Sequence, residues 1–140
     1  METQQPFRCA VCGMQFDEVI ANLESGALAH YSDREFPGRC VLAVHEHAEK
    51  LEELSPERLT RLMLDVQRAG QAIRKATGAP RINYAVLGNV APHIHVHLIP
   101  RGVPTDRHGT DTPWGPPPRT EPLAEKESER LRRGIAMALE

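Results

Sequence analysis

The feature that most constrains the fold is the run H-I-H-V-H-L-I, which begins at His93 and alternates histidine with aliphatic residues. Successive side chains of a β-strand point to opposite faces, so this period of two predicts a strand over Ile94–Ile99 with its aliphatic side chains in the core. His93, His95 and His97 then share the other face, each about 6.6 Å from the next. Pro100 is expected to end the strand.

Three histidines on one face of a strand are compatible with three interpretations. The first is an exposed strand on which the histidines are incidental. The second is a three-histidine metal site, which is disfavoured because His93 and His97 would lie about 13 Å apart. The third is covalent catalysis by His95, because neutral imidazole is a good nucleophile near neutral pH and its phosphoryl adduct is readily hydrolysed.

The rest of the chain predicts an α+β domain. Ser55 is a good N-cap, Pro56 suits the first helical position, and the apolar residues that follow have helical spacing until Gly78. Further strands are predicted at Val19–Leu23, Ala27–Tyr31, Cys40–Val44 and Ile82–Leu87. We expect a single domain over residues 1–140, with an N-terminal tail (1–8), a Pro-rich irregular arm (102–122) and a C-terminal helix (123–139). Two helices among hairpin-linked strands favour an antiparallel sheet.

Composition excludes several classes of function. The chain has 140 residues and a net charge of −2, and it shows no basic stripe interleaved with aromatic residues, so we expect no nucleic-acid partner. The segment Met1–Phe7 is polar and no apolar run has the length of a membrane span, so we expect no membrane association. Three cysteines, two of them in a C-x-x-C pair, do not suit a secreted disulfide framework. A cytoplasmic location is expected.

The histidine run and its flanks resemble the histidine triad family. The residues that carry the likeness are G-N-V-A-P before the run, H-I-H-V-H-L-I itself, P-R after it, and the upstream segment P-G-R-C-V-L-A-V-H-E-H-A-E-K-L-E-E-L. The chain is most similar to a bacterial branch in which an Asp-Pro-Trp arm follows the triad. The resemblance implies a five-stranded antiparallel sheet with two helices, paired into a homodimer with a continuous sheet.

Residue by residue, the resemblance implies a nucleotide site. His95 would be the nucleophile, and His97 would bind the phosphate oxygens beside it. Asn89 and the turn amides after it, including that of Val90, would cradle the phosphate. Asn89 could instead be an ordinary turn residue. Trp114 could line the nucleotide pocket, within one chain or across a dimer, or could anchor the arm. No magnesium is required for such chemistry.

The pair Cys9 and Cys12 has the spacing of a zinc knuckle, but one C-x-x-C is half of a site. A redox motif or two unrelated thiols are the alternatives. Some histidine triad proteins complete such a pair with two histidines, and the resemblance places these at His47 and His93. The result would be a structural zinc. His45 could replace His47 if the register is shifted.

The resemblance implies a nucleotide hydrolase that acts through a nucleotidyl-histidine on dinucleoside polyphosphates or nucleoside phosphoramidates. The alternatives are a nucleotidyltransferase or phosphorylase, and a non-catalytic nucleotide-binding module.

Two positions depart from the family. The place of the acidic residue that holds the ribose in many members falls here on Tyr31 or Ser32, with Asp33 just beyond. Arg39 stands where many members have histidine. Elsewhere, Cys40 is expected in the core, and His30 and His108 on the surface or in loops.

Overall fold

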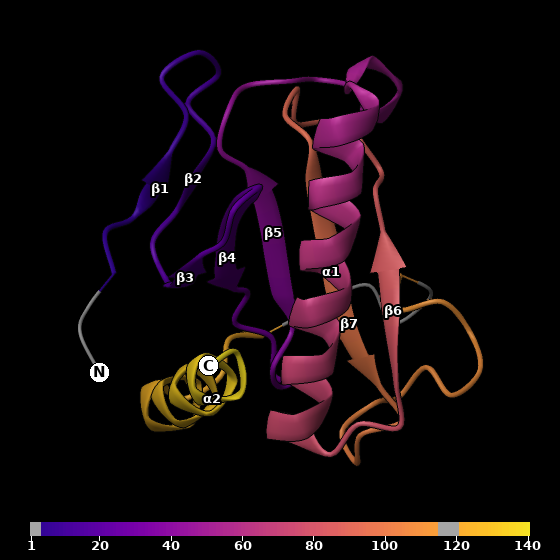
Figure 1. The fold of residues 1–140 in the computed structure, drawn as a ribbon. Helices are drawn as coiled ribbons and strands as arrows, with labels where there is room; N and C mark the ends of the chain where they lie inside the picture. The colour runs from indigo at the N-terminus through magenta and orange to yellow at the C-terminus, as the bar shows by residue number, and fades with distance from the viewer. Residues whose placement is uncertain (1–3, 115–120) are drawn as a thin grey trace.

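The computed structural model describes residues 4–114 and 121–140, and its main feature is a five-stranded antiparallel sheet (Figure 1). Its strand order is β3-β4-β5-β7-β6. These strands are β3 (Val19–Asn22), β4 (Gly26–His30), β5 (Cys40–Val44), β6 (Arg81–Ala85) and β7 (His95–Arg101). Two helices, α1 (Pro56–Thr77) and α2 (Glu125–Ala138), complete the fold, with a short 3-10 helix at Leu51–Glu53. The α+β class, the antiparallel sheet and the two helices predicted from the sequence are confirmed.

A separate two-stranded ribbon lies near the N-terminus. It pairs β1 (Phe7–Arg8) with β2 (Gln15–Phe16). The last two residues of the predicted tail 1–8 therefore form a strand. Phe7, the first residue of this strand, is buried against the sheet. The first three residues of that tail lie outside the described residues.

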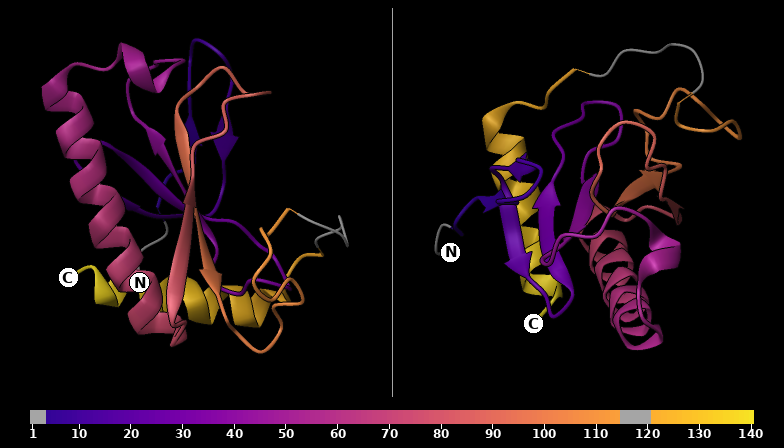
Figure 2. Two further views of the ribbon diagram at one scale, coloured as in Figure 1. Left: turned by 90° about the vertical axis from the view of Figure 1, so that its right-hand side faces the viewer. Right: turned by 90° about the horizontal axis from the view of Figure 1, so that it is seen from above.

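The two faces of the sheet have different partners. One face packs on the helices through the main core, whose strand members include Leu28, Leu42, Val96 and Leu98. The opposite face carries small residues such as Ala27 and Ala43, covered by the β1–β2 ribbon. His95 pairs with Ala43 and His97 with Val41 across β5 and β7, so both histidines lie on this second face. Figure 2 shows α1 and the segment after β7 on opposite sides of the sheet.

Helix α1 begins and ends where its sequence signals place it. The hydroxyl of Ser55 accepts a hydrogen bond from the backbone N–H of Arg58 at 3.2 Å. At the other end Gly78 has φ +74°, a left-handed conformation that favours glycine, and its N–H donates to the carbonyl of Arg74 at 2.8 Å. The loop between α1 and β6 is therefore short.

Strand β7 continues through Pro100, where the sequence analysis predicted its end. Pairing with β5 stops at Leu98, whereas pairing with β6 continues through Ile82 opposite Pro100 to Arg81 opposite Arg101. Beyond Leu98, β7 is in effect an edge strand on its β5 side. A proline, which has no N–H to donate, is tolerated on such an edge.

The arm after β7 is irregular as far as it is described, and residues 115–120 lie outside the described residues. It is nevertheless held to the domain. Two histidines expected on the surface or in loops are buried: His30 is 4% exposed and His108, within the arm, is 6% exposed. His108 contacts Phe36 and pairs with Glu35, contacts that the loop composition did not reveal. Cys40 is fully buried, as predicted.

Among the described residues, no helix combines the length and the apolar character needed to span a membrane.

Candidate functional site

The histidines of the triad do not form one uniform row. His95 and His97 are half-buried on β7, with their ring centroids 5.1 Å apart. His93 precedes the strand, is 1% exposed, and turns toward the N-terminal ribbon, where Phe7 meets its ring edge-on. The open histidine site therefore consists of His95 and His97, and His93 has a different set of partners.

The ring of His95 is oriented by a backbone carbonyl. Its Nδ1 lies 2.8 Å from the carbonyl oxygen of His93. A carbonyl only accepts, so Nδ1–H is the donor and the proton of the neutral ring is on Nδ1. The lone pair is then on Nε2, the nitrogen farther from the backbone. This is the tautomer that a nucleophilic histidine requires.

The ring of His97 is oriented by an arginine. Nη2 of Arg39 lies 3.3 Å from Nδ1 of His97, while Nη1 of Arg39 is paired with Asp33 at 2.9 Å. Burial, followed by the charge of Arg39 and the proximity of His95, lowers the pKa of His97 to about 4. His97 is therefore neutral at physiological pH.

An aromatic boundary surrounds this pair. The guanidinium of Arg39 lies 4.0 Å from the centroid of the Tyr31 ring and 6.0 Å from that of Trp114. The rings of Tyr31 and Trp114 lie 6.2 Å and 5.9 Å from that of His97. Trp114 is 44% exposed, so part of this residue is accessible. It reaches His97 within the same chain.

The arm that carries Trp114 is fixed by buried polar contacts. Arg101 donates to Asp106 at 2.8 Å and to the carbonyls of Gly109 and Asp111 at 3.0 and 2.8 Å. Glu35 accepts from Nδ1 of His108 at 2.5 Å. These contacts join the arm to β7 and to the loop before β5, on the side of the sheet where His97 lies.

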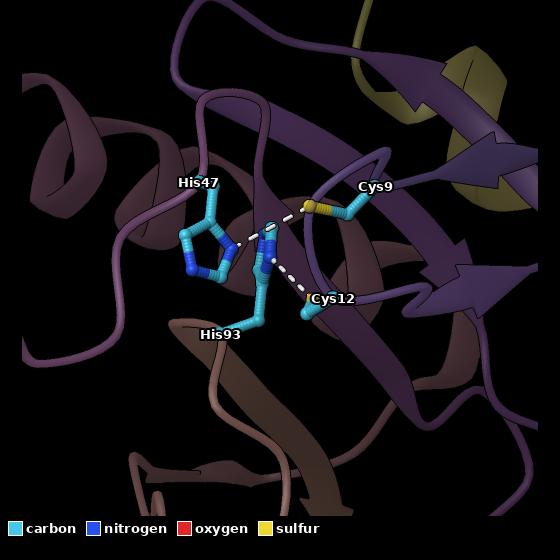
Figure 3. Close-up of side chains that lie close together, drawn as sticks. All are labelled: Cys9, Cys12, His47 and His93. Atoms are coloured by element: carbon cyan, nitrogen blue, oxygen red, sulfur yellow. Dashed lines mark hydrogen bonds between the residues drawn. The ribbon is translucent and has the colours of Figure 1, made fainter.

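A second cluster joins the N-terminal ribbon to the sheet (Figure 3). Cys9, Cys12, His47 and His93 each offer one ligand atom, and these atoms all lie within 4.8 Å of one another. Sγ of Cys9 is 3.5 Å from Nδ1 of His47, and Sγ of Cys12 is 3.5 Å from Nδ1 of His93. Two thiols and two imidazoles at such distances can hold a tetrahedral metal ion.

The surroundings of this cluster suit metal ligands. Nε2–H of His93 donates to the carbonyl of Val44 at 2.8 Å, which leaves Nδ1 free to bind a metal. A hydrogen bond from the backbone N–H of Cys12 is the main cause that lowers the pKa of the Cys9 thiol to about 6. Gly13 has φ +79° and closes the turn between the cysteines and β2.

Comparison with known proteins identifies the family. The family model for the HIT domain matches residues 16–103, which is more than half of the chain. The chain belongs to the HIT domain family. Among solved structures, a histidine triad protein from Sinorhizobium meliloti 1021 superposes with a TM-score of 0.76 at 28% identity, covering 84% of this chain and 86% of that one. One from Bradyrhizobium japonicum gives 0.79 at 22% identity, covering 87% and 90%.

Two further proteins are similar to this chain. A Zn-bound histidine triad family protein from Mycobacterium smegmatis has a TM-score of 0.63 at 22% identity, covering 85% of this chain and 84% of that one. A bis(5'-nucleosyl)-tetraphosphatase (asymmetrical) from Schizosaccharomyces pombe is 33% identical over 70 residues. That match covers 46% of this chain and 38% of the yeast protein, so the chain spans well under half of this relative.

The predicted site residues of this HIT protein fall into three groups. His95, His97 and Trp114 are brought together, and so are Cys9, Cys12, His47 and His93. Asn89 and Val90 lie in the loop before β7, and both are exposed, with Val90 95% exposed. His45, the alternative ligand, points its Nε2 at the carbonyl of Leu23 at 2.8 Å and is outside the cluster.

The ion pair between Asp33 and Arg39, behind His97, was not predicted from the sequence. Asp33 was considered only as a neighbour of the ribose position, but its side chain is fully buried against Arg39. The available signal was two opposite charges flanking a Pro-Gly turn directly before the buried strand at Cys40. Charges placed so close to a core strand tend to be paired.

Proposed function

We propose that this HIT protein is a nucleotide hydrolase that forms a nucleotidyl-histidine on His95. The observation that carries the proposal is the tautomer of His95, whose Nδ1–H is committed to the carbonyl of His93 while Nε2 keeps its lone pair. The proposed substrates are dinucleoside polyphosphates or nucleoside phosphoramidates, in keeping with the tetraphosphatase relative. We assign Trp114 to the nucleotide pocket because its ring lies against that of His97.

The chemistry proceeds in two displacements. Nε2 of His95 uses its lone pair to form a bond to the α-phosphorus, and the bond from phosphorus to the leaving group breaks with its electron pair on the leaving group. Water then attacks the same phosphorus and releases His95. His97 donates a hydrogen bond to a phosphate oxygen, and the turn at Asn89 and Val90 supplies backbone N–H groups to the developing charge. None of these steps uses magnesium.

Product analysis by ³¹P NMR tests the proposal. Diadenosine tetraphosphate is incubated with the protein in EDTA, once in buffer alone and once with excess inorganic phosphate. AMP and ATP as the only products support the hydrolase, whereas ADP formed from added phosphate supports the phosphorylase alternative. Binding without turnover supports the non-catalytic module. The His95→Asn variant is the control and should bind nucleotide without consuming it.

We further propose a structural zinc held by Cys9, Cys12, His47 and His93. The donor set supports it: two thiols, one with a lowered pKa, and two imidazoles whose Nδ1 atoms face the sulfurs. When bound, zinc would tie the ribbon at Phe7–Arg8 to the sheet. His93 would then have both ring nitrogens engaged, and catalysis would depend on His95 and His97.

We also propose a homodimer through the free edge of β6. Tyr84, Val86 and Leu87 on this edge and the following loop are 50%, 39% and 49% exposed, and Met63 on α1 is 42% exposed. A sheet edge with exposed apolar side chains tends to pair with another chain. Pairing β6 with its copy would extend the sheet into a continuous one.

A further inference from the structure

Arg39 is buried beside His97, the proposed phosphate-binding histidine. Only 4% of the residue is exposed. Its charge is compensated by Asp33, whose other oxygen, Oδ1, accepts from the backbone N–H of Glu35 at 3.0 Å. Because the pair is neutral as a whole, Arg39 is not a free cation that could attract a phosphate. Its influence on a substrate must pass through His97.

The contact between Arg39 and His97 determines where the proton of the imidazole lies. A guanidinium has five N–H donors and no acceptor, and it does not lose its proton in proteins. The nitrogen that faces it, Nδ1 of His97, must therefore accept. The ring is then neutral, with its proton on Nε2. Protonation of Nδ1 would break this hydrogen bond and place two cations side by side.

Arg39 is held in this position at an energetic cost. Its Nε is buried and has no hydrogen-bond partner among the residues that the structure describes. An unsatisfied buried donor destabilises a protein. Among the described residues, the other titratable groups in contact with the His97 ring are His95 on β7 and Tyr31, the residue after β4, and neither accepts a hydrogen bond from that Nε.

With His97 fixed in this way, the triad contains no proton donor for a departing group. The Nδ1–H of His95 is bonded to a carbonyl and its Nε2 attacks phosphorus, while His93 directs its Nε2–H to Val44. Neutral Nε2–H of His97 is a hydrogen-bond donor but a very weak acid. A reaction at this site must therefore proceed without general acid catalysis from the triad.

We propose that Arg39, fixed by Asp33, is a positioning residue that keeps His97 in the Nε2–H tautomer, so that the enzyme is selective for leaving groups that depart as stable anions. This inference rests on the proposed function. A phosphoanhydride suits it, because the P–O bond breaks with its electron pair on a phosphate oxygen whose conjugate acid has a pKa of about 6. The amine of a phosphoramidate leaves only if its nitrogen gains a proton.

The tautomer is measured by NMR of protein labelled with ¹⁵N-histidine, which distinguishes protonated from unprotonated ring nitrogens. In the wild type at neutral pH, His97 should show an unprotonated Nδ1 and a protonated Nε2. In Arg39→Met the pattern should change to a mixture of tautomers. Arg132→Met, which removes a paired arginine from α2, is the matched control and should retain the wild-type pattern. A wild-type His97 protonated on Nδ1, or no change in Arg39→Met, overturns the proposal.

Arg39→Met leaves Asp33 as an unpaired buried charge, and that variant could unfold. The double variant Asp33→Asn with Arg39→Met removes both charges together and is the second test. Asparagine keeps the oxygen that accepts from Glu35. The His97 pattern should change in the double variant as well, and an unchanged pattern in a folded double variant contradicts the proposal.

The selectivity is measured with substituted phenyl esters of adenosine 5′-monophosphate, whose leaving groups differ in acidity. Wild-type kcat/KM, which reports the step in which the leaving group departs, should fall steeply as the leaving group becomes more basic, by at least about 100-fold across the series, because no acid compensates. Arg39→His, which places the family's residue at this position, should give a shallower dependence. A flat dependence in the wild type overturns the proposal. If the wild type consumes no nucleotide at all, the proposed function fails, and the NMR result alone decides whether Arg39 fixes His97.

Discussion

The arm that carries Trp114 should be released when Arg101 is replaced by methionine. Arg101 is 5% exposed and donates four hydrogen bonds, to Asp106 at 2.8 Å, Asn83 at 2.6 Å, Gly109 at 3.0 Å and Asp111 at 2.8 Å. Methionine fills a similar volume but donates none of them. The change therefore tests whether this one guanidinium holds the arm against β7.

The expected decrease in the free energy of unfolding depends on which hydrogen bonds the former partners of Arg101 keep after the substitution. Breaking a buried ion pair by removing one partner costs about 3 to 5 kcal/mol. Here the carboxylate of Asp106 keeps the backbone N–H groups of Gly102 and His108 at 3.1 and 2.9 Å, and the two carbonyls belong to an arm that can open to water. The lower end of the range, about 3 kcal/mol, is therefore expected, which is about a hundredfold in the folding equilibrium constant.

The assay is urea unfolding followed by two signals. The chain has one tryptophan, so fluorescence reports on Trp114 and its arm, whereas far-UV circular dichroism reports on the whole fold. In Arg101→Met the fluorescence transition should move to lower urea than the dichroism transition, because the arm opens first. Arg130→Met, which removes an exposed pair with Glu127, is the control and should change stability by less than about 0.5 kcal/mol.

Two results would contradict this role of Arg101. The first is a decrease of less than about 1 kcal/mol in the free energy of unfolding of Arg101→Met, which would mean that the four hydrogen bonds contribute little. The second is a pair of coincident transitions at reduced stability, which would mean that the arm is not a separate cooperative unit.

Three further predictions concern the metal, the pH dependence and the assembly. Protein purified without a histidine tag should contain about one zinc per chain. Cys9→Ser should lower the midpoint of thermal unfolding strongly and the specific activity of the folded protein only slightly, with Cys40→Ala as the thiol control. Metal-free protein that is stable and active would contradict the zinc site. The free energy of unfolding should fall as pH is lowered from about 6.5 to 4. Burial lowers the pKa of His97 to about 4 and also lowers the pKa of His30. In this pH range the unfolded chain therefore binds protons that the folded chain does not. The pH profile should be flatter in His97→Gln, and an identical slope would show that His97 does not contribute. Leu87→Asp should convert the proposed dimer into a monomer in sedimentation experiments, whereas Met137→Asp, which is exposed on α2 and away from the β6 edge, should not. A wild-type monomer at all concentrations would exclude the β6 interface.

The sequence was most informative where a single local rule decides the structure. Ser55, Pro56 and Gly78 are sufficient to place the ends of α1, because capping and left-handed glycine act within one turn of the chain. The alternation that begins at His93 placed the aliphatic side chains in the core, because a strand has a fixed period. The prediction that Pro100 ends the strand was wrong. A proline is tolerated at this position because pairing between β7 and β5 has already stopped at Leu98, and strand pairing cannot be deduced from the local sequence.

Long-range polar contacts were the part that the sequence could not supply. Glu35 and His108 are 73 positions apart, and nothing in either segment identifies the other as its partner. Arg39 was noted as a departure from the family, yet its contact with His97 depends on how β5 and β7 pair. The cluster of Cys9, Cys12, His47 and His93 was predicted only because the family resemblance joined residues that spacing alone left as half of a site.

Covalent catalysis by His95 can be observed by intact-mass spectrometry after rapid quench with diadenosine tetraphosphate in EDTA. We expect a transient mass gain equal to one adenosine monophosphate, located on His95 by fragmentation and absent from His95→Asn. Turnover by the wild type with no adduct at any time point, combined with undiminished turnover by His95→Asn, would contradict it. An adduct on another residue, such as His97, would contradict the assigned nucleophile.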